Sequence, residues 1–255
     1  MLGAVSWSGS VAVEPGRLTV TGRIGPTAAH AHAAVQIVLV SSGTLGLTNA
    51  AGTRTTADAA VIPAGARHAM DVDNAHGLMI YIEAASTEGR ALSGLFEGDT
   101  SRVDSWVHTA LPLSGFASAA AGKDPHETAD AALRALTDTA ARSQRPTDCH
   151  PSVRHAIELL PDLINGPVRR GEVATRVGLS PDRLGRLFAR DLGLSFPAYV
   201  RWIRLMRAID EVRRGATFTD AAHAAGFTDS SHANRVFHEM FGLTPLHAAR
   251  GLRWA

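Results

Sequence analysis

The chain contains nearly the same ten residues twice, and this repeat restricts its fold more than any other feature. RLFARDLGLS occupies residues 186–195, and RVFHEMFGLT occupies residues 235–244, 49 positions later. Both copies read arginine, an apolar residue, phenylalanine, three variable residues, a large apolar residue, glycine, leucine and a hydroxyl residue. The repeat predicts two copies of one structural unit.

Each copy has the apolar spacing of a helix that is buried on one face. Apolar residues recur at positions i, i+3, i+4 and i+8, which share one side of an α-helix. Arg186 and Arg235 fall between these positions, so both are expected to point away from their cores. The apolar positions are Leu184, Leu187, Phe188 and Leu192 in the first copy, and Ala233, Val236, Phe237 and Phe241 in the second.

Each predicted helix follows a short helical stretch and a tight turn that contains glycine. EVATRVGLS precedes the first helix and TDAAHAAGFTD precedes the second. Ser180 and Asp229 are good helix-starting residues. A short helix, a tight turn and a second helix make the helix-turn-helix unit, whose second helix lies in the DNA major groove. The repeat therefore predicts two DNA-reading helices.

The first turns of a recognition helix face the base edges, so candidate DNA contacts can be named. Arginine can bind guanine O6 and N7 together, and asparagine can pair with adenine in the same way. The simplest alternative is that these are exposed helix residues without a role. The candidates are Asp182, Arg183, Gly185, Arg186 and Arg190 in the first helix, and Ser230, Ser231, Asn234 and Arg235 in the second.

The stretch from EVATRVGLS to FGLTPLHAAR, about 80 residues with both turns, resembles the AraC/XylS family of bacterial transcription regulators. The resemblance implies a domain that places two helices in successive major-groove segments of promoter DNA. It also implies contact with RNA polymerase. The long stretch at about 196–214 would then set the distance between the two reading helices. Its arginines could touch phosphates, although solvated or salt-bridged surface is the simpler interpretation for most of them.

The charge distribution agrees with a nucleic-acid partner for the second half. Residues 1–150 hold 10 Lys and Arg against 14 Asp and Glu, a net of −4, whereas residues 151–255 hold 15 against 10, a net of +5. The second half has no lysine, so all 15 of these cations are arginine, the side chain best suited to phosphates and guanine edges. An excess of this size is also common on solvated surfaces.

The first 83 residues consist of short runs rich in Val and Ile, broken by Gly, Pro, Asn and Ser, and they predict a β-barrel or sandwich. Two stretches within it resemble the cupin motifs. One has Gly25, His30, His32, Gln36 and Gly43 in the motif's spacing, and the other is PAGARH at 63–68. The resemblance implies neighbouring strands of a small double-sheet barrel.

The cupin-like residues predict a metal or effector site. His30 and His32 share one strand face with Gln36, and His68 would approach from the second motif. Three imidazoles and one oxygen suit Zn²⁺ or another divalent transition metal. Gln36 stands where cupins usually have a carboxylate, which removes a charge and weakens metal binding. The equal alternative is a histidine cluster without a metal, either contacting a small organic effector or hydrogen-bonded within the protein.

The remaining residues complete the expected organisation, an α+β multidomain chain. Asp124 caps a predicted helix whose small apolar face (Ala129, Leu133, Leu136, Ala140) packs on the barrel or on a second subunit, so a homodimer is one possibility. The expected parts are a cupin-like barrel at 1–84, a helical transmission or dimerisation segment at 85–142, a linker at 143–150 and a double helix-turn-helix domain at 151–255.

Three functions fit these features. The leading one is a cytoplasmic transcription regulator, not an enzyme, whose barrel binds a small effector or metal ion. A second is a metal-dependent cupin enzyme, a dioxygenase or isomerase, with an accessory DNA-binding domain, and a third is a DNA-binding protein without an effector. The cytoplasmic location rests on apolar runs shorter than the roughly 18–20 residues of a membrane helix, a start unlike a signal peptide, and the lone Cys149.

Overall fold

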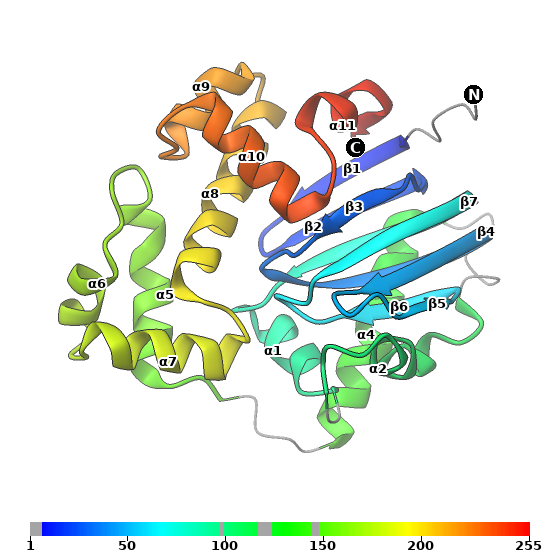
Figure 1. Cartoon of the computed structure of the whole chain (residues 1–255), viewed down its shortest axis with the longest axis horizontal. Helices are drawn as coiled ribbons and strands as arrows, with labels where there is room; N and C mark the ends of the chain where they lie inside the picture. The colour runs from blue at the N-terminus through cyan, green and yellow to red at the C-terminus, as the bar shows by residue number, and fades with distance from the viewer. Residues whose placement is uncertain (1–6, 97–98, 117–123, 144–147) are drawn as a thin grey trace. The chain divides into compact units, whose positions relative to one another are not determined.

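A computed structural model of the chain describes residues 7–96, 99–116, 124–143 and 148–255. They form two compact units (Figure 1). The sheet unit comprises the described residues within Met1–Thr147 together with Phe241–Ala255. The helical unit is Asp148–Met240. Residues 144–147 of the predicted linker lie outside the described residues.

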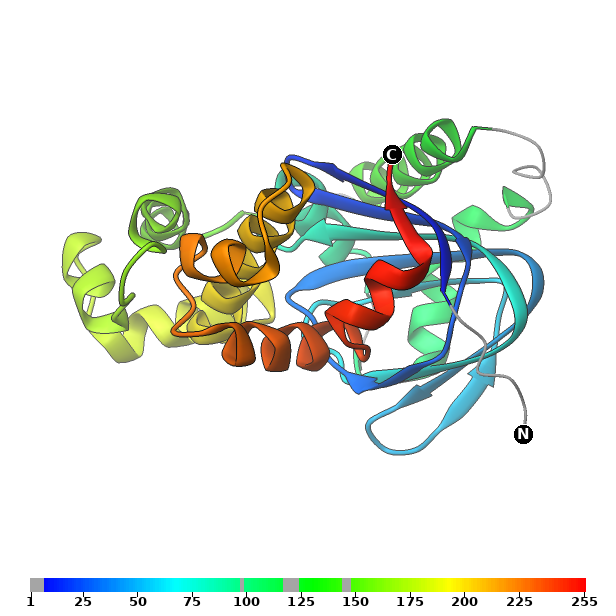
Figure 2. The ribbon, with the colours of Figure 1, turned by 90° about the horizontal axis from the view of Figure 1, so that it is seen from above.

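The sheet unit is built on one curled sheet, which Figure 2 shows from above. The strand order is β5-β4-β7-β2-β1-β8, with β3 paired to β7 and β6 paired to β4. All pairs are antiparallel except β1 with β8. The strands are β1 Ser8–Glu14, β2 Arg17–Arg23, β3 Thr27–His30, β4 Ala34–Asn49, β5 Arg54–Thr56, β6 Ala59–Ile62, β7 His68–Glu83 and β8 Leu252–Trp254.

Helices of the sheet unit pack against this sheet because they carry small or apolar faces. The α4 helix, Pro125–Ser143, begins as predicted: Asp124 Oδ1 accepts from the backbone N–H of His126 at 2.7 Å. Ala129, Leu136 and Ala140 of the predicted apolar face of α4 are buried. Leu133 is only half-buried, and Ala132 is buried instead. The other helical elements are α1 Thr87–Ser93, α2 Val103–Thr109, the 3₁₀ turn η1 Leu111–Leu113 and α11 Pro245–Gly251.

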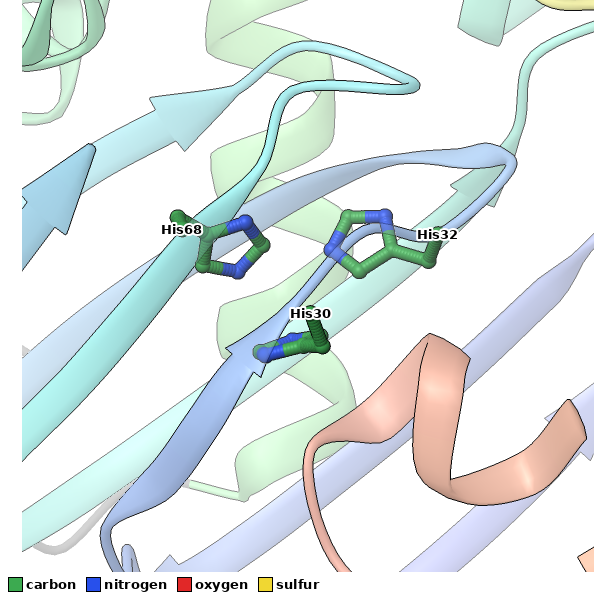
Figure 3. Close-up of side chains that lie close together, drawn as sticks. All are labelled: His30, His32 and His68. Atoms are coloured by element: carbon green, nitrogen blue, oxygen red, sulfur yellow. The ribbon is translucent and has the colours of Figure 1, made fainter. Parts of the chain in front are cut away.

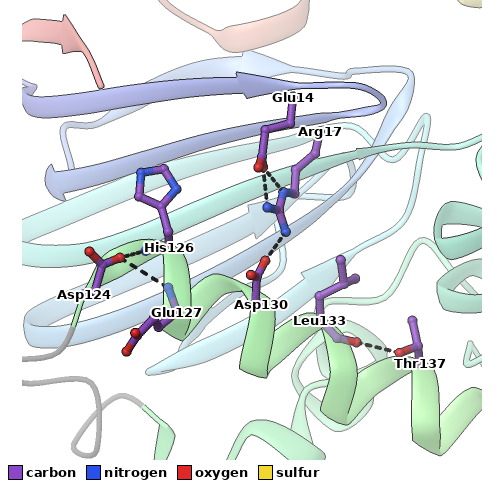
Figure 4. Close-up of polar contacts among 8 residues, drawn as sticks. All are labelled: Glu14, Arg17, Asp124, His126, Glu127, Asp130, Leu133 and Thr137. Atoms are coloured by element: carbon purple, nitrogen blue, oxygen red, sulfur yellow. Dashed lines mark hydrogen bonds and ion pairs between the residues drawn. The ribbon is translucent and has the colours of Figure 1, made fainter.

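A half-buried ion pair ties α4 to the sheet (Figure 4). The guanidinium of Arg17, on β2, donates to Asp130 on α4 at 2.5 Å and also pairs with Glu14 on β1. The Arg17 side chain is 15% exposed, so this contact is less screened by water than a surface pair. The predicted helical segment thus packs on the sheet of its own chain, and its role in dimerisation stays a prediction.

The helical unit consists of short helices around an apolar core. Its largest fully buried side chains are Trp202, Tyr199 and Phe188, and Phe188 meets Phe196 edge to face. The helices are α5 Pro151–Leu163, α6 Arg170–Arg176, α7 Pro181–Leu192, α8 Phe196–Arg213, α9 Phe218–Ala224 and α10 Ser230–Phe241, whose last residue belongs to the sheet unit.

The predicted fold class, a β-rich first part followed by helices and a helical DNA-binding part, is confirmed. Helices were expected throughout the predicted helix-turn-helix domain at 151–255, but its last residues, Leu252–Trp254, form strand β8 by pairing with the backbone of β1. Such a pairing joins residues about 240 positions apart and leaves no local trace. Among the described residues, no helix is both long enough and apolar enough to cross a bilayer.

Asp191 connects two helices of the helical unit and offers a stability test. Its carboxylate accepts from the backbone N–H of His150 at 2.9 Å, at the start of α5, and from Arg190 at 2.5 Å. Burial opposes the charged carboxylate, but the hydrogen bonds from Arg190 and His150 outweigh it, and the pKa of Asp191 is lowered from 3.8. The folded helical unit therefore favours the ionised carboxylate.

We expect Asp191→Asn to lower the free energy of unfolding by about 1.5–3 kcal/mol at pH 7, the range for hydrogen bonds to charged groups. Because the folded pKa is depressed, the contribution is present above the unfolded pKa and is lost as pH falls through the folded pKa. Urea unfolding followed by circular dichroism should therefore show the difference shrinking below about pH 4. Asp182→Asn, at an exposed acid, is the matched control; an equal loss in both variants would contradict this account.

Candidate nucleic-acid interface and histidine site

The first predicted reading helix, α7, is oriented by its apolar side. Ser180 Oγ accepts from the backbone N–H of Arg183 at 3.3 Å and so begins the helix. Leu184, Leu187 and Phe188 are buried. The side chains of Asp182, Arg183 and Arg186 are exposed on the opposite side. The structure therefore leaves the predicted contacts of the first turns open to a ligand.

Two other candidates of α7 have partners within the helical unit. The Nε of Arg190 donates to Asp191 at 2.5 Å, so this guanidinium is partly committed to a carboxylate. Gly185 lies against Arg170 of α6, since a Cβ on this glycine would be 2.9 Å from Arg170 Nη1. Arg170 also donates to Asp182 at 3.4 Å. The cation beside the first turn of α7 is thus Arg170, which the sequence patterns did not single out.

The second predicted reading helix, α10, repeats this arrangement. Asp229 Oδ1 accepts from the backbone N–H of His232 at 2.7 Å. Ala233 and Val236 are buried, and Phe237 is half-buried, with Met240 joining the apolar side. Facing outward are Ser231, Asn234 and Arg235, which are exposed, and Ser230, which is half-buried.

Gly226 forms the turn that precedes α10. Its φ is +78°, and a Cβ at this position would lie 1.8 Å from the carbonyl oxygen of Ile164. Only glycine allows both the left-handed backbone and this close approach. The matching turn before α7 contains Gly178 at φ +71°. Both helix-turn-helix units therefore use the turn that the sequence predicts.

The arginines of α8 mostly bind their own chain. Arg204 donates to the carbonyl oxygens of Ile164 and Gly166 at 3.3 and 2.5 Å. Arg213 and Arg214, the residue directly after α8, both pair with Asp210, and Arg201 lies 3.8 Å from Glu239. These contacts fit the expected role of α8 as the connector between the reading helices.

The three predicted histidines converge inside the sheet unit (Figure 3). His30 on β3, His32 after it and His68 on β7 are each at most 1% exposed. One ring nitrogen from each lies within 4.8 Å of the other two. The convergence follows from pairing, because His30 is directly opposite His68 in the β3–β7 ladder. We call these residues, with Gln36, the histidine site.

Backbone carbonyl groups fix how the three rings present their nitrogens. The Nδ1 atom of His30 lies 2.8 Å from Ala28 O, that of His32 2.8 Å from Ala34 O, and that of His68 3.0 Å from Ala66 O. A carbonyl oxygen can only accept, so each Nδ1 carries the proton of a neutral ring. All three Nε2 atoms then hold lone pairs, as in histidines that ligate metals.

Gln36 brings an amide group to two of these lone pairs. Its Oε1 is 2.9 Å from His32 Nε2 and 3.1 Å from His68 Nε2, and its Nε2 is 3.3 Å from the hydroxyl of Tyr81. An oxygen facing two nitrogen lone pairs is unfavourable unless a cation lies between them. Without one, the amide turned by 180° donates both N–H groups to the histidines and accepts from Tyr81.

Protonation of the histidines does not relieve the contact between Gln36 Oε1 and the two Nε2 lone pairs, because burial disfavours the charged imidazolium. Burial lowers the pKa of His32 below 6.5. The pKa of His68 is lowered well below 6.5, first by burial and then by the neighbouring His30 and His32. The site therefore offers neutral nitrogen donors, and its two stable arrangements are a turned amide or a bound metal cation.

Two aromatic residues border the site that the sequence patterns did not identify. Tyr81 is buried and lies edge-on to His32, with ring centroids 5.1 Å apart. Trp106 on α2 lies edge-on to His68, at 6.0 Å. Tyr81 is opposite Gln36 in the β4–β7 ladder, a register that joins residues 45 positions apart. Local spacing carries no signal for such a partner.

One family model matches the second half of the chain. Residues 173–251 match a family model described as a helix-turn-helix domain. The transcriptional regulator NimR of Escherichia coli is 28% identical over 103 residues, which are 39% of this chain and 37% of NimR. The uncharacterised regulator YpdC of the same organism is 36% identical over 80 residues, 31% of this chain and 28% of YpdC. The chain thus matches about a third of the length of each.

Solved structures of ToxT from Vibrio cholerae share the fold of the chain. One covers 91% of this chain and 96% of ToxT with a TM-score of 0.59 at 13% identity, and an apo lysine-to-alanine variant of ToxT gives 0.61 at 12% identity with 94% and 99% covered. Both relatives, NimR and YpdC, are described as helix-turn-helix transcriptional regulators. Residues 173–251, which include α7 and α10, are therefore a helix-turn-helix domain.

Proposed function

We propose that the chain is a sequence-specific transcription regulator that reads promoter DNA with α7 and α10 and adjusts this binding through a divalent transition metal ion held at the histidine site. The observation that carries the proposal is the matched pair Arg186 and Arg235. Both are exposed at equivalent positions of two helices whose opposite sides are buried.

Chemistry supports DNA as the partner of the helical unit. Exposed Arg186 and Arg235 can each hydrogen-bond a guanine edge, and Asn234 can pair with adenine. In such an interface, contacts to the base edges give specificity. Polar side chains that contact phosphates fix the position of the protein on the DNA. Arg183 and Arg170 beside α7, and Ser230 and Ser231 on α10, suit that second role.

The donor set supports a metal ion such as Zn²⁺ at the histidine site. Three buried, neutral imidazoles present lone pairs, and Gln36 Oε1 can provide a fourth ligand. With zinc–nitrogen bonds of about 2.1 Å, tetrahedral ligand atoms lie roughly 3.4 Å apart. Nitrogens separated by up to 4.8 Å would therefore close around the ion. Nickel, copper and iron also accept imidazole ligands.

A small organic effector is the second candidate occupant of the sheet unit. One ToxT structure contains an unsaturated fatty acid, so a protein of this fold holds an organic ligand. The described interior of this chain offers three convergent histidines, which suit a cation better than an acyl chain. We therefore propose a metal ion first, within a cupin-like barrel.

The proposal extends to partners and location. Binding at a promoter would bring the chain to RNA polymerase, and the chain would act there as a homodimer. A regulator of this kind acts where the chromosome lies, so we propose a cytoplasmic location. The enzyme alternative requires turnover at the histidine site, and it would be supported if metal-loaded protein converted a substrate while Arg186→Ala with Arg235→Ala left the cellular role intact.

The reading arginines can be tested on a DNA fragment selected by the wild-type protein. Arg186→Ala and Arg235→Ala should each weaken binding by about 1–3 kcal/mol, roughly 5- to 150-fold, and relax the preference at the base that each reads. Fluorescence anisotropy on the selected fragment and on single-base variants measures both effects. Affinity should also fall steeply with salt, because phosphate contacts release counterions.

Arg134→Ala is the matched control, since Arg134 is an exposed arginine on α4 in the sheet unit. This variant should bind like the wild type. If selectivity for the fragment survives the loss of both Arg186 and Arg235, these arginines do not read bases.

The histidine site can be tested with zinc and cobalt added to the full chain. We expect one ion per chain, with zinc affinity reduced at least about 100-fold in His30→Ala and in His68→Ala, more than losing a group that merely orients a ligand. Gln36→Glu should raise the affinity, because it supplies a negative charge. Competition with a chromophoric chelator measures these constants, and the cobalt absorption spectrum reports the ligand geometry.

His76→Ala serves as the control, because His76 is exposed on β7. It should bind zinc like the wild type. Binding that survives His30→Ala with His68→Ala, or no binding of zinc, cobalt or nickel, would contradict a metal at this site.

A further inference from the structure

The residues that end the second reading helix lie against the histidine site. Phe241, the last residue of α10, and Gly242 both belong to the sheet unit. The Phe241 ring meets Tyr81 edge to face, with centroids 5.3 Å apart. The carbonyl oxygen of Gly242 accepts from the backbone N–H of Ala28, on β3, at 3.0 Å. The end of α10 is therefore held by the strands that carry the site.

Gly242 fits into a space that no side chain could share. A Cβ at this position would lie 2.5 Å from Ala28 O, 2.8 Å from His30 Nδ1 and 2.8 Å from Thr27 Cβ. Its φ is +69°, the left-handed conformation that ends a helix. The turn thus contacts the ring and the backbone acceptor that together orient one proposed metal ligand, His30.

The chain beyond the turn is also attached to the sheet. Strand β8 pairs in parallel with β1, and the N–H of Ala255 donates to Val11 O at 2.9 Å. Gly251 approaches so closely that a Cβ would lie 1.7 Å from Trp7 O. The segment after α10 is therefore attached to the sheet at two places, at Gly242 through Ala28 and at β8 through β1.

A second line of contacts leads from the ligands to the same turn. Gln36 lies between the histidines and the hydroxyl of Tyr81, and Tyr81 lies against Phe241. With a cation present, Gln36 turns its oxygen to the ion and its N–H to Tyr81. Without the cation the amide reverses, and Tyr81 must donate instead of accept. Binding of a cation at the histidine site therefore reverses the direction of the Gln36–Tyr81 hydrogen bond.

We propose that the Phe241–Gly242 turn senses the occupancy of the histidine site through Tyr81 and His30 and transmits it to α10. The inference rests on the proposed metal site and specifies how it is regulated. When the imidazoles close on an ion, His30 and the Gln36 amide take fixed positions, and the turn packed on them loses freedom. Metal binding thereby steadies the end of the second reading helix, whereas the matching residues of the first copy, 188–194, all belong to the helical unit.

Hydrogen exchange of the full chain with and without zinc tests this directly. The segment at 237–243 contains the turn, and its repeat counterpart at 188–194 is a matched internal control. A coupling of ordinary size changes an equilibrium at least about five-fold. We expect zinc to slow exchange at 237–243 about five-fold or more and to leave 188–194 unchanged. Tyr81→Phe, which keeps the ring but removes the hydroxyl, should bind zinc and lose most of this effect.

The outcomes are distinguishable. If chelator competition shows zinc bound but exchange at 237–243 is unchanged, or slows equally in both segments, the turn does not sense the site although the metal site stands. A full effect in Tyr81→Phe likewise overturns the route through Gln36. If no zinc binds, the competition experiment shows it, and the metal site and the inference fall together.

Discussion

The burial of one apolar side on each reading helix is the constraint on which the account depends. Burying a Leu or Phe side chain contributes about 1.5–3 kcal/mol, and α7 buries Leu184, Leu187, Phe188 and Leu192 together. Rotating the helix by about half a turn would expose Leu184 and Phe188 and bury Arg186 without a partner. The outward direction of Arg186 is thus a consequence of core packing, and the same holds for Arg235 opposite Ala233 and Val236.

The histidine site depends on a different constraint, the hydrogen bonds of three Nδ1 atoms to backbone carbonyls. Ala28, Ala34 and Ala66 fix the tautomers through main-chain groups, so the orientation of the rings is independent of any single side chain. Burial keeps the rings neutral. What remains variable is the Gln36 amide, which has two orientations and links the rings to Tyr81. The sheet unit therefore contains a fixed donor set beside one two-state group.

How much of this could be predicted from sequence depends on how local each feature is. The starts of α4, α7 and α10 were predictable because Asp124, Ser180 and Asp229 cap helices within three residues of themselves. The meeting of His30, His32 and His68 followed from motif spacing. The place of Tyr81 depends on the β4–β7 register, and Arg170 beside Gly185 depends on helix packing. The attachment of Phe241–Ala255 to the sheet was not predictable, since FGLTP reads as the end of a helix-turn-helix repeat.

The central claim is that two equivalent helices read DNA, and selection of binding sites from random double-stranded DNA tests it most directly. Two reading helices in successive major-groove segments predict two preferred blocks, each with a guanine, with centres about 10 bp apart. The block read by Arg186 should lose its guanine preference in Arg186→Ala while the other block is kept. A single block, or no enriched sequence, would contradict the account.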